Sequence, residues 1–89
     1  MLDITGSVAV ITGGGSGIGE SIAKYWTNLG GKVVLGDVAP EGLARVEKEI
    51  QGAGGEAATM VMDVTKEEDN AALAQVAIDR FGAINLVVP

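Results

Sequence analysis

Cysteine and histidine are both absent from this chain of 89 residues. Without cysteine there is no disulfide framework, no thiol nucleophile and no thiolate metal site. Without histidine as well, the chain cannot pair a nucleophile with an imidazole base. The acidic run Glu67–Asp69 has no second ligand group that converges on it from elsewhere in the sequence, so we also predict no metal site there.

Basic residues and aromatic residues are also scarce. Six lysines and arginines stand against twelve aspartates and glutamates, a net charge of −6, and this balance argues against a nucleic-acid partner. The first four residues, Met1–Ile4, have no basic start and no long apolar run, so we expect no signal peptide, no membrane span and a cytoplasmic protein. With 3% aromatic and 47% hydrophobic residues, the core is expected to be aliphatic, which suits helices packed on a parallel sheet.

The stretch Thr12–Gly19 reads TGGGSGIG and follows an apolar, β-branched segment. Apolar residues continue after it at spacings of four, four and three, which places them on one face of a helix: Ile18, Ile22, Trp26 and Leu29. A glycine turn between a strand and a helix can approach a ligand closely, because glycine has no Cβ and tolerates positive φ. The helix N-terminus presents free N–H groups to an anion. The turn therefore predicts a pyrophosphate site, and the alternative is a turn that serves chain reversal alone.

The rest of the chain alternates strands and helices. Strands are predicted at Ser7–Thr12, Lys32–Asp37, Ala57–Met62 and Ile84–Val88. Helices are predicted at Gly17–Leu29, from Pro40 to an end within Gly52–Gly55, and between Thr65 and Gly82. Such alternation predicts a parallel sheet with right-handed crossovers. The expected fold class is α/β, a Rossmann-like doubly wound sheet of four strands and three helices in the order 3-2-1-4. Residues 1–89 then form one unit, truncated at the fourth strand, after a lead-in of Met1–Gly6.

Local signals mark the ends of the predicted helices. Gly30 and Gly31 end the first, Pro40 begins the second, and Gly82 caps the third. Thr65–Glu68 reads as a capping box, in which the Thr65 hydroxyl and the Glu68 carboxylate satisfy free N–H groups reciprocally. The inner face of the third helix is expected to comprise Leu73, Val76, Ala77 and Phe81.

The order of the glycines resembles a known signature. The strict pattern G-x-G-x-x-G would place its last glycine at Ile18, whereas T-G-x-x-x-G-x-G fits Thr12, Gly13, Gly17 and Gly19. This resembles the cofactor signature of the short-chain dehydrogenase/reductase family, and the likeness extends along nearly the whole chain. A P-loop is excluded because no Gly-Lys-Ser/Thr follows the turn.

Asp37 stands eighteen residues after Gly19, at the end of the second predicted strand. A carboxylate there can accept hydrogen bonds from the 2′- and 3′-hydroxyls of an adenosine ribose. The alternative is an ordinary aspartate that begins a turn. Because no lysine or arginine stands in the glycine loop or directly after Asp37 to receive a 2′-phosphate, we predict NAD rather than NADP as the cofactor.

Asp63 and Val64 follow the third predicted strand in the same way. The family resemblance implies that this pair holds the adenine amino group and its ring face, and the alternative is that Asp63 only helps to cap the next helix. The remaining predicted cofactor contacts surround the glycine loop. They are the Thr12 hydroxyl, which would fix the loop, Gly15 within it, the backbone N–H groups of Ser16 and Ile18, and Val38 beside the adenine.

The resemblance implies an oxidoreductase that transfers hydride between NAD and a carbonyl or secondary alcohol. It also implies that the family's catalytic Ser, Tyr and Lys lie beyond Pro89, which itself stands where the family has the first residue of Asn-Asn-Ala-Gly. Two rival interpretations remain: a nucleotide-binding module without chemistry, and a truncated half-domain that self-associates through the edge of Ile84–Val88. We also expect a homo-oligomer.

Overall fold

The computed structural model describes residues 3–89, so the first two residues of the predicted lead-in lie outside it. Along this part of the chain the elements are β1 (Val8–Thr12), α1 (Gly17–Asn28), β2 (Lys32–Asp37), α2 (Pro40–Gly52), β3 (Glu56–Val61), α3 (Glu67–Phe81) and β4 (Leu86–Val88). The strands form one parallel sheet in the order β3-β2-β1-β4. This arrangement confirms the predicted Rossmann-type α/β fold.

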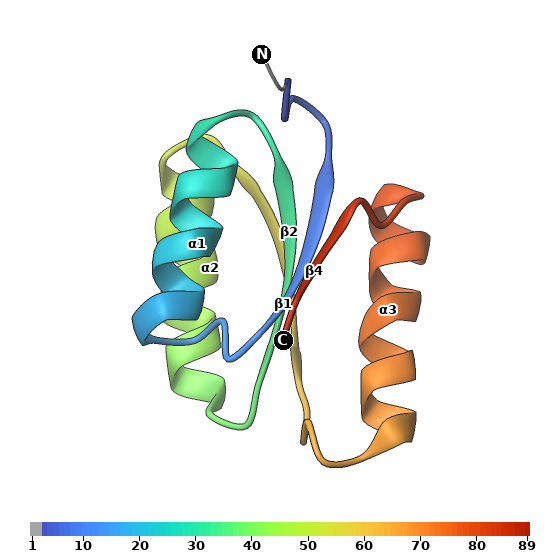
Figure 1. Cartoon of the computed structure of the whole chain (residues 1–89). Coiled ribbons are helices and arrows are strands. Elements are labelled where there is room, and N and C mark those ends of the chain that lie inside the picture. The colour runs from blue at the N-terminus through green and yellow to red at the C-terminus, as the bar shows by residue number, and fades with distance from the viewer. Residues whose placement is uncertain (1–2) are drawn as a thin grey trace.

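Helices cover both faces of the sheet, α1 and α2 on one side and α3 on the other (Figure 1). Because side chains alternate along a strand, each face builds its own apolar cluster. Ala9, Ile11, Val33 and Leu35 pack with the first pair of helices, whereas Val8, Val10 and Val34 pack with α3. The central strands are thus buried on both faces, which explains their unbroken apolar sequences.

The inner face of α1 differs from the predicted one. Ala23 is its buried residue, and Ile22 and Trp26 pack partly against the core. Ile18 is 80% exposed and Leu29 is 43% exposed. Ile18 lies in the first turn of α1 and Leu29 lies just past its last residue, so both ends of the predicted apolar stripe extend beyond the region that contacts the sheet.

The capping box predicted for Thr65–Glu68 is wrong. The N-cap of α3 is Lys66, and no side chain caps this helix. Because the helix begins at Glu67, Thr65 lies one residue before the N-cap, and its hydroxyl instead donates to Asp63 Oδ1 at 2.7 Å. At the other end, Gly82 adopts a left-handed conformation with φ 78° and ends α3 as predicted. On the predicted inner face Leu73 and Ala77 are fully buried, while Val76 and Phe81 are only partly buried.

Strand β4 begins at Leu86 rather than at Ile84, and Asn85 explains the difference. Its side-chain Oδ1 accepts from the Val8 N–H at 2.8 Å, and its own N–H donates to the Val8 carbonyl at 2.8 Å. The amide side chain therefore takes the place of one ladder hydrogen bond before regular pairing begins. Within residues 3–89, β4 pairs with β1 alone, and Leu86 and Val87 are exposed along it.

Candidate functional site

All predicted site residues lie at or just beyond the carboxyl ends of the strands. Thr12 ends β1, Asp37 ends β2, and the β3–α3 loop begins just after Val61. In the parallel register Thr12 is paired with Gly36, and Asp37 is paired with Val61, so these strand ends lie at one edge of the sheet (Figure 1). This is the edge at which doubly wound sheets bind ligands.

The glycine loop is pinned to the end of β2. The N–H groups of Gly13 and Gly14 both donate to the Gly36 carbonyl, at 2.7 and 3.2 Å. Gly13 and Gly17 have positive φ values of 70° and 58°, so the chain can turn sharply on either side of the loop. A Cβ on Gly19 would overlap with the Gly13 carbonyl oxygen, so only glycine lets the first turn of α1 lie against the start of the loop.

The N-terminus of α1 has no side-chain cap. Its N-cap residue, Ser16, has extended backbone geometry, and the Ser16 side chain makes no capping hydrogen bond. Ser16, Gly17 and Ile18 are exposed. The first turn of α1 therefore directs its N–H groups and the positive end of its dipole toward solvent beside the glycine loop.

Asp37 is already engaged by the backbone around it. Its Oδ2 accepts from the Gly15 N–H at 3.0 Å, and its Oδ1 accepts from the Val38 and Ala39 N–H groups at 2.7 and 3.4 Å. The residue thus ties the glycine loop to the end of β2, a role that its position in the sequence does not reveal. An ionised carboxylate offers about four lone-pair positions, so Asp37 retains acceptor capacity for a further donor.

Asp63 organises the loop after β3. Its Oδ1 accepts from the Thr65 hydroxyl and from the Thr65 N–H at 2.7 and 2.9 Å, and its own N–H donates to Asp69 Oδ2 at 2.9 Å. The Thr65 hydroxyl, followed by the Thr65 N–H, holds the pKa of Asp63 below its ordinary value, so this carboxylate is ionised. The next residue, Val64, is 52% exposed. Val38, which follows the neighbouring strand β2, is 66% exposed.

Thr12 connects β1 with β4 rather than with the glycine loop. Its hydroxyl donates to the Val88 carbonyl at 3.5 Å, a long contact between two strand ends 76 residues apart. This structure shows no hydrogen bond from the Thr12 hydroxyl to the glycine loop that would support its predicted role in fixing the loop.

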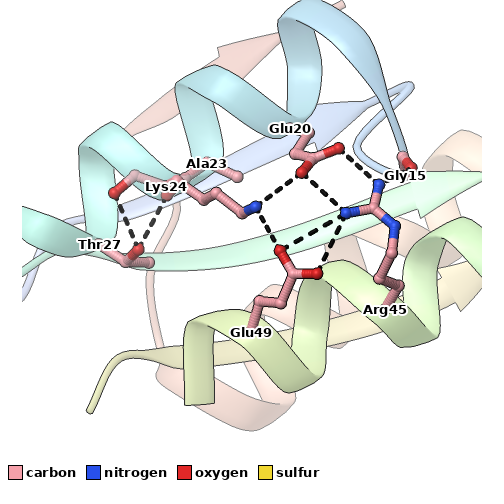
Figure 2. Close-up of polar contacts among 7 residues, drawn as sticks. All are labelled: Gly15, Glu20, Ala23, Lys24, Thr27, Arg45 and Glu49. Atoms are coloured by element: carbon pink, nitrogen blue, oxygen red, sulfur yellow. Dashed lines mark hydrogen bonds and ion pairs between the residues drawn. The ribbon is translucent and has the colours of Figure 1, made fainter. Parts of the chain in front are cut away.

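Sequence reasoning missed a cluster of charged residues on α1 and α2 beside the loop: Glu20, Lys24, Arg45 and Glu49 (Figure 2). Two signals for it were present, since Glu20 and Lys24, and likewise Arg45 and Glu49, are four residues apart within one helix. That the two pairs join across the helices could not be read from these spacings.

Two negative findings apply to residues 3–89. No helix there is both long enough and apolar enough to cross a membrane. Over the same residues, no three acidic side chains gather in an arrangement that could hold a metal ion.

A parallel sheet in the order 3-2-1-4, with a glycine turn leading into α1 and an acidic residue at the end of β2, defines the class of dinucleotide-binding α/β proteins. Residues 7–89 match the family described as short chain dehydrogenase. The chain belongs to this family.

Curated relatives match nearly the whole chain. The 7alpha-hydroxysteroid dehydrogenase of Escherichia coli K12 is 38% identical over 87 residues, which are 98% of this chain and 34% of the relative. The 2,5-dichloro-2,5-cyclohexadiene-1,4-diol dehydrogenase of Sphingobium indicum is 43% identical over 82 residues, 91% of this chain and 32% of the relative. The chain thus spans about a third of the length of these relatives.

Solved structures agree. A short chain dehydrogenase/reductase from Burkholderia phymatum, in complex with NAD, superposes with a TM-score of 0.94 at 40% identity and covers 98% of this chain and 31% of its own. The 3-ketoacyl-(acyl-carrier-protein) reductase of Brucella melitensis, complexed with NADH, gives a TM-score of 0.85 at 39% identity, with 94% of this chain and 33% of its own covered.

Proposed function

We propose that the carboxyl edge of this sheet binds NAD, and that the chain is the cofactor-binding part of an oxidoreductase. One observation carries the proposal: the Gly15 N–H is hydrogen-bonded to Asp37 directly beside the uncapped N-terminus of α1. An anion site and a carboxylate acceptor are therefore held at a fixed separation, as a dinucleotide with a pyrophosphate and a ribose requires. The NAD and NADH complexes of two structural relatives support this choice of cofactor.

The roles of the residues follow from their positions. The pyrophosphate would lie against the backbone of Gly13, Gly15 and Gly17. Its oxygens would accept hydrogen bonds from the N–H groups of Ser16 and Ile18, while Gly19 keeps α1 close to the loop. A ribose hydroxyl would donate to the remaining lone-pair position of Asp37. Val38 and Val64, both exposed at this edge, would flank the adenine, and Asp63 would accept from its amino group.

The charges around Asp37 favour NAD over NADP. A 2′-phosphate at the ribose would meet the Asp37 carboxylate, and like charges at close range repel. Arg45 reaches the glycine loop, but its guanidinium is paired with Glu20 and Glu49. Little unpaired positive charge is therefore left near Asp37 to bind a 2′-phosphate.

Calorimetric titration with NAD and NADP tests the proposal. A hydrogen bond to a charged group contributes about 1.5–3 kcal/mol, so Asp37→Ala should weaken NAD binding roughly 10- to 100-fold. The same substitution should reduce the preference for NAD over NADP. Asp79→Ala is the matched control, because it removes an exposed carboxylate of α3 whose partner is Gln75. Tighter binding of NADP than of NAD by the unmodified protein would contradict the assignment.

For the complete enzyme we propose hydride transfer between NAD(H) and a carbonyl or secondary alcohol, the chemistry that the nicotinamide supplies when bound. A steroid and a cyclic diol occur in the names of relatives, so a cyclic alcohol is a reasonable first substrate class. The only tyrosine, Tyr25, is 67% exposed on α1, and the sequence holds no histidine or cysteine. We therefore assign no catalytic residue here, and expect the 89-residue chain to bind NAD without turnover, as a fluorimetric assay of NADH formation would test.

A further inference from the structure

Both backbone polar groups of Gly15, which belong to two successive peptide units, are held by side chains. Its N–H donates to Asp37 Oδ2 at 3.0 Å, and its carbonyl oxygen accepts from Arg45 Nη2 at 3.4 Å. The first turn of α2 lies so close that a Cβ on Gly42 would be 2.5 Å from the same carbonyl oxygen. Strand end, glycine loop and α2 therefore meet at one buried residue of the loop.

Arg45 is itself oriented by carboxylates on two helices. Its Nη2 lies 2.6 Å from Glu20 Oε1 and its Nη1 lies 3.0 Å from Glu20 Oε2, a bidentate pair between α2 and α1. Glu49, one turn further along α2, accepts from Nη1 at 3.3 Å. Figure 2 shows the guanidinium facing the carboxylates of Glu20 and Glu49, with Gly15 beside it. The planar guanidinium of Arg45 is fixed in one orientation by this bidentate pair. A lysine ammonium would not be fixed in this way.

Glu20 is the best protected member of the cluster, with a side chain only 18% exposed. Hydrogen bonds first from Arg45 and then from Lys24 lower the pKa of Glu20 to about 2, so it stays ionised at neutral pH. Lys24 lies 2.7 Å from Glu20 Oε2 and also pairs with Glu49, but the structure gives it no contact with the glycine loop. The cluster thus contains one cation that touches the loop and one that does not.

We propose that Arg45, oriented by Glu20 and Glu49, is a positioning residue for the glycine loop: it holds the Gly15 carbonyl, and so the backbone at Gly15, so that the loop is preorganised for the pyrophosphate of the cofactor. The cofactor part of this inference rests on the proposed function. Arg45 acts through Gly15 and not by touching NAD. Its side chain is 47% exposed, and exposed ion pairs contribute little to global stability, so the main effect should be local to the loop.

The test compares Arg45→Met with Lys24→Met, which removes the other cation of the same cluster. Each variant loses one positive charge and keeps an unbranched apolar stem. One net hydrogen bond corresponds to a change of about two- to tenfold, so Arg45→Met should weaken NAD binding by about three- to tenfold, and Lys24→Met by less than about twofold. Arg45→Lys should restore the charge without restoring the affinity, because it lacks the bidentate fork.

A second readout needs no cofactor. Amide hydrogen exchange, measured by NMR without NAD, should become about three- to tenfold faster at Gly15 in Arg45→Met than in Lys24→Met, while amides of β1 and β2 exchange alike in both variants. Faster exchange at Gly15 together with weaker NAD binding supports the inference. Equal exchange at Gly15, or equal NAD affinity, in the two variants overturns it.

The two readouts also separate this inference from the proposed function. If the unmodified protein does not bind NAD, the proposed function fails, and with it the link to the cofactor. Amide hydrogen exchange at Gly15 then still decides whether Arg45 fixes the backbone at Gly15. If the unmodified protein binds NAD and Asp37→Ala weakens binding as predicted while Arg45→Met does not alter it, the inference alone fails.

Discussion

Two glycines of α2 should respond in opposite directions to the same substitution. Gly42 lies in the first turn, where an added Cβ would be 2.5 Å from the Gly15 carbonyl oxygen and 3.2 Å from its carbon. Gly52 is the last residue of the helix, and an added Cβ there would have no atom within 4 Å apart from its chain neighbours and the adjacent helix backbone. Neither residue has positive φ, so alanine is compatible with both backbone conformations.

The magnitudes follow from these surroundings. Replacing glycine by alanine in a helix stabilises by about 0.5–1 kcal/mol where nothing obstructs the new methyl group. Overpacking costs about 1–3 kcal/mol, and at Gly42 the obstructing atoms are backbone, which cannot rotate away as a side chain can. Gly52→Ala should therefore stabilise by up to about 1 kcal/mol, and Gly42→Ala should destabilise by up to about 2 kcal/mol.

Thermal unfolding followed by circular dichroism measures the difference. For a domain of this size, about 1 kcal/mol shifts the Tm by roughly 4–8 °C, so the two variants should lie on opposite sides of the unmodified protein. Because Gly42 touches the loop, Gly42→Ala should also weaken NAD binding, whereas Gly52→Ala should not. If Gly42→Ala raised the Tm as much as Gly52→Ala does, the close approach of α2 to Gly15 would be refuted.

Three further predictions concern charge, core and edge. The pKa of Glu20 is lowered in the folded protein from 4.5 to about 2, so its stabilising contribution is present above pH 4.5 and is lost as the pH falls toward 2. In urea titrations the difference in unfolding free energy between the unmodified protein and Glu20→Gln should shrink over that range, and a difference independent of pH would contradict the assignment. Ile11→Ala, at a fully buried position of β1, should cost about 2–5 kcal/mol in the same titrations, and a cost below about 1 kcal/mol would show a core that collapses to fill the space. The 89-residue chain should associate through β4, whose second edge is unpaired within residues 3–89 and carries exposed Leu86 and Val87, and a single monomeric species in light scattering at micromolar concentration would count against this.

Much of the fold could be predicted because its signals are local. Pro40 at the start of α2 and left-handed Gly82 after α3 act through their own backbone geometry, so a reader of the sequence finds them without the fold. The apolar strands and the glycine turn are likewise recognisable from a few consecutive residues. The capping box was predicted wrongly because α3 begins with Lys66 as its N-cap, one residue later than the box requires, and that start depends on the path of the chain between β3 and α3.

The order of strands and helices, the family, and the residues that gather at the carboxyl edge of the sheet could all be predicted from the amino-acid sequence, because periodicity and turn chemistry act over short stretches of chain. How those residues contact one another became visible in the folded chain. The contacts of Gly15 with Asp37 and Arg45 join positions 22 and 30 residues apart, and the bidentate pair of Arg45 with Glu20 joins positions 25 residues apart. Such contacts depend on how closely α1, α2 and the glycine loop approach once the core has packed, and no local pattern in the sequence encodes that distance.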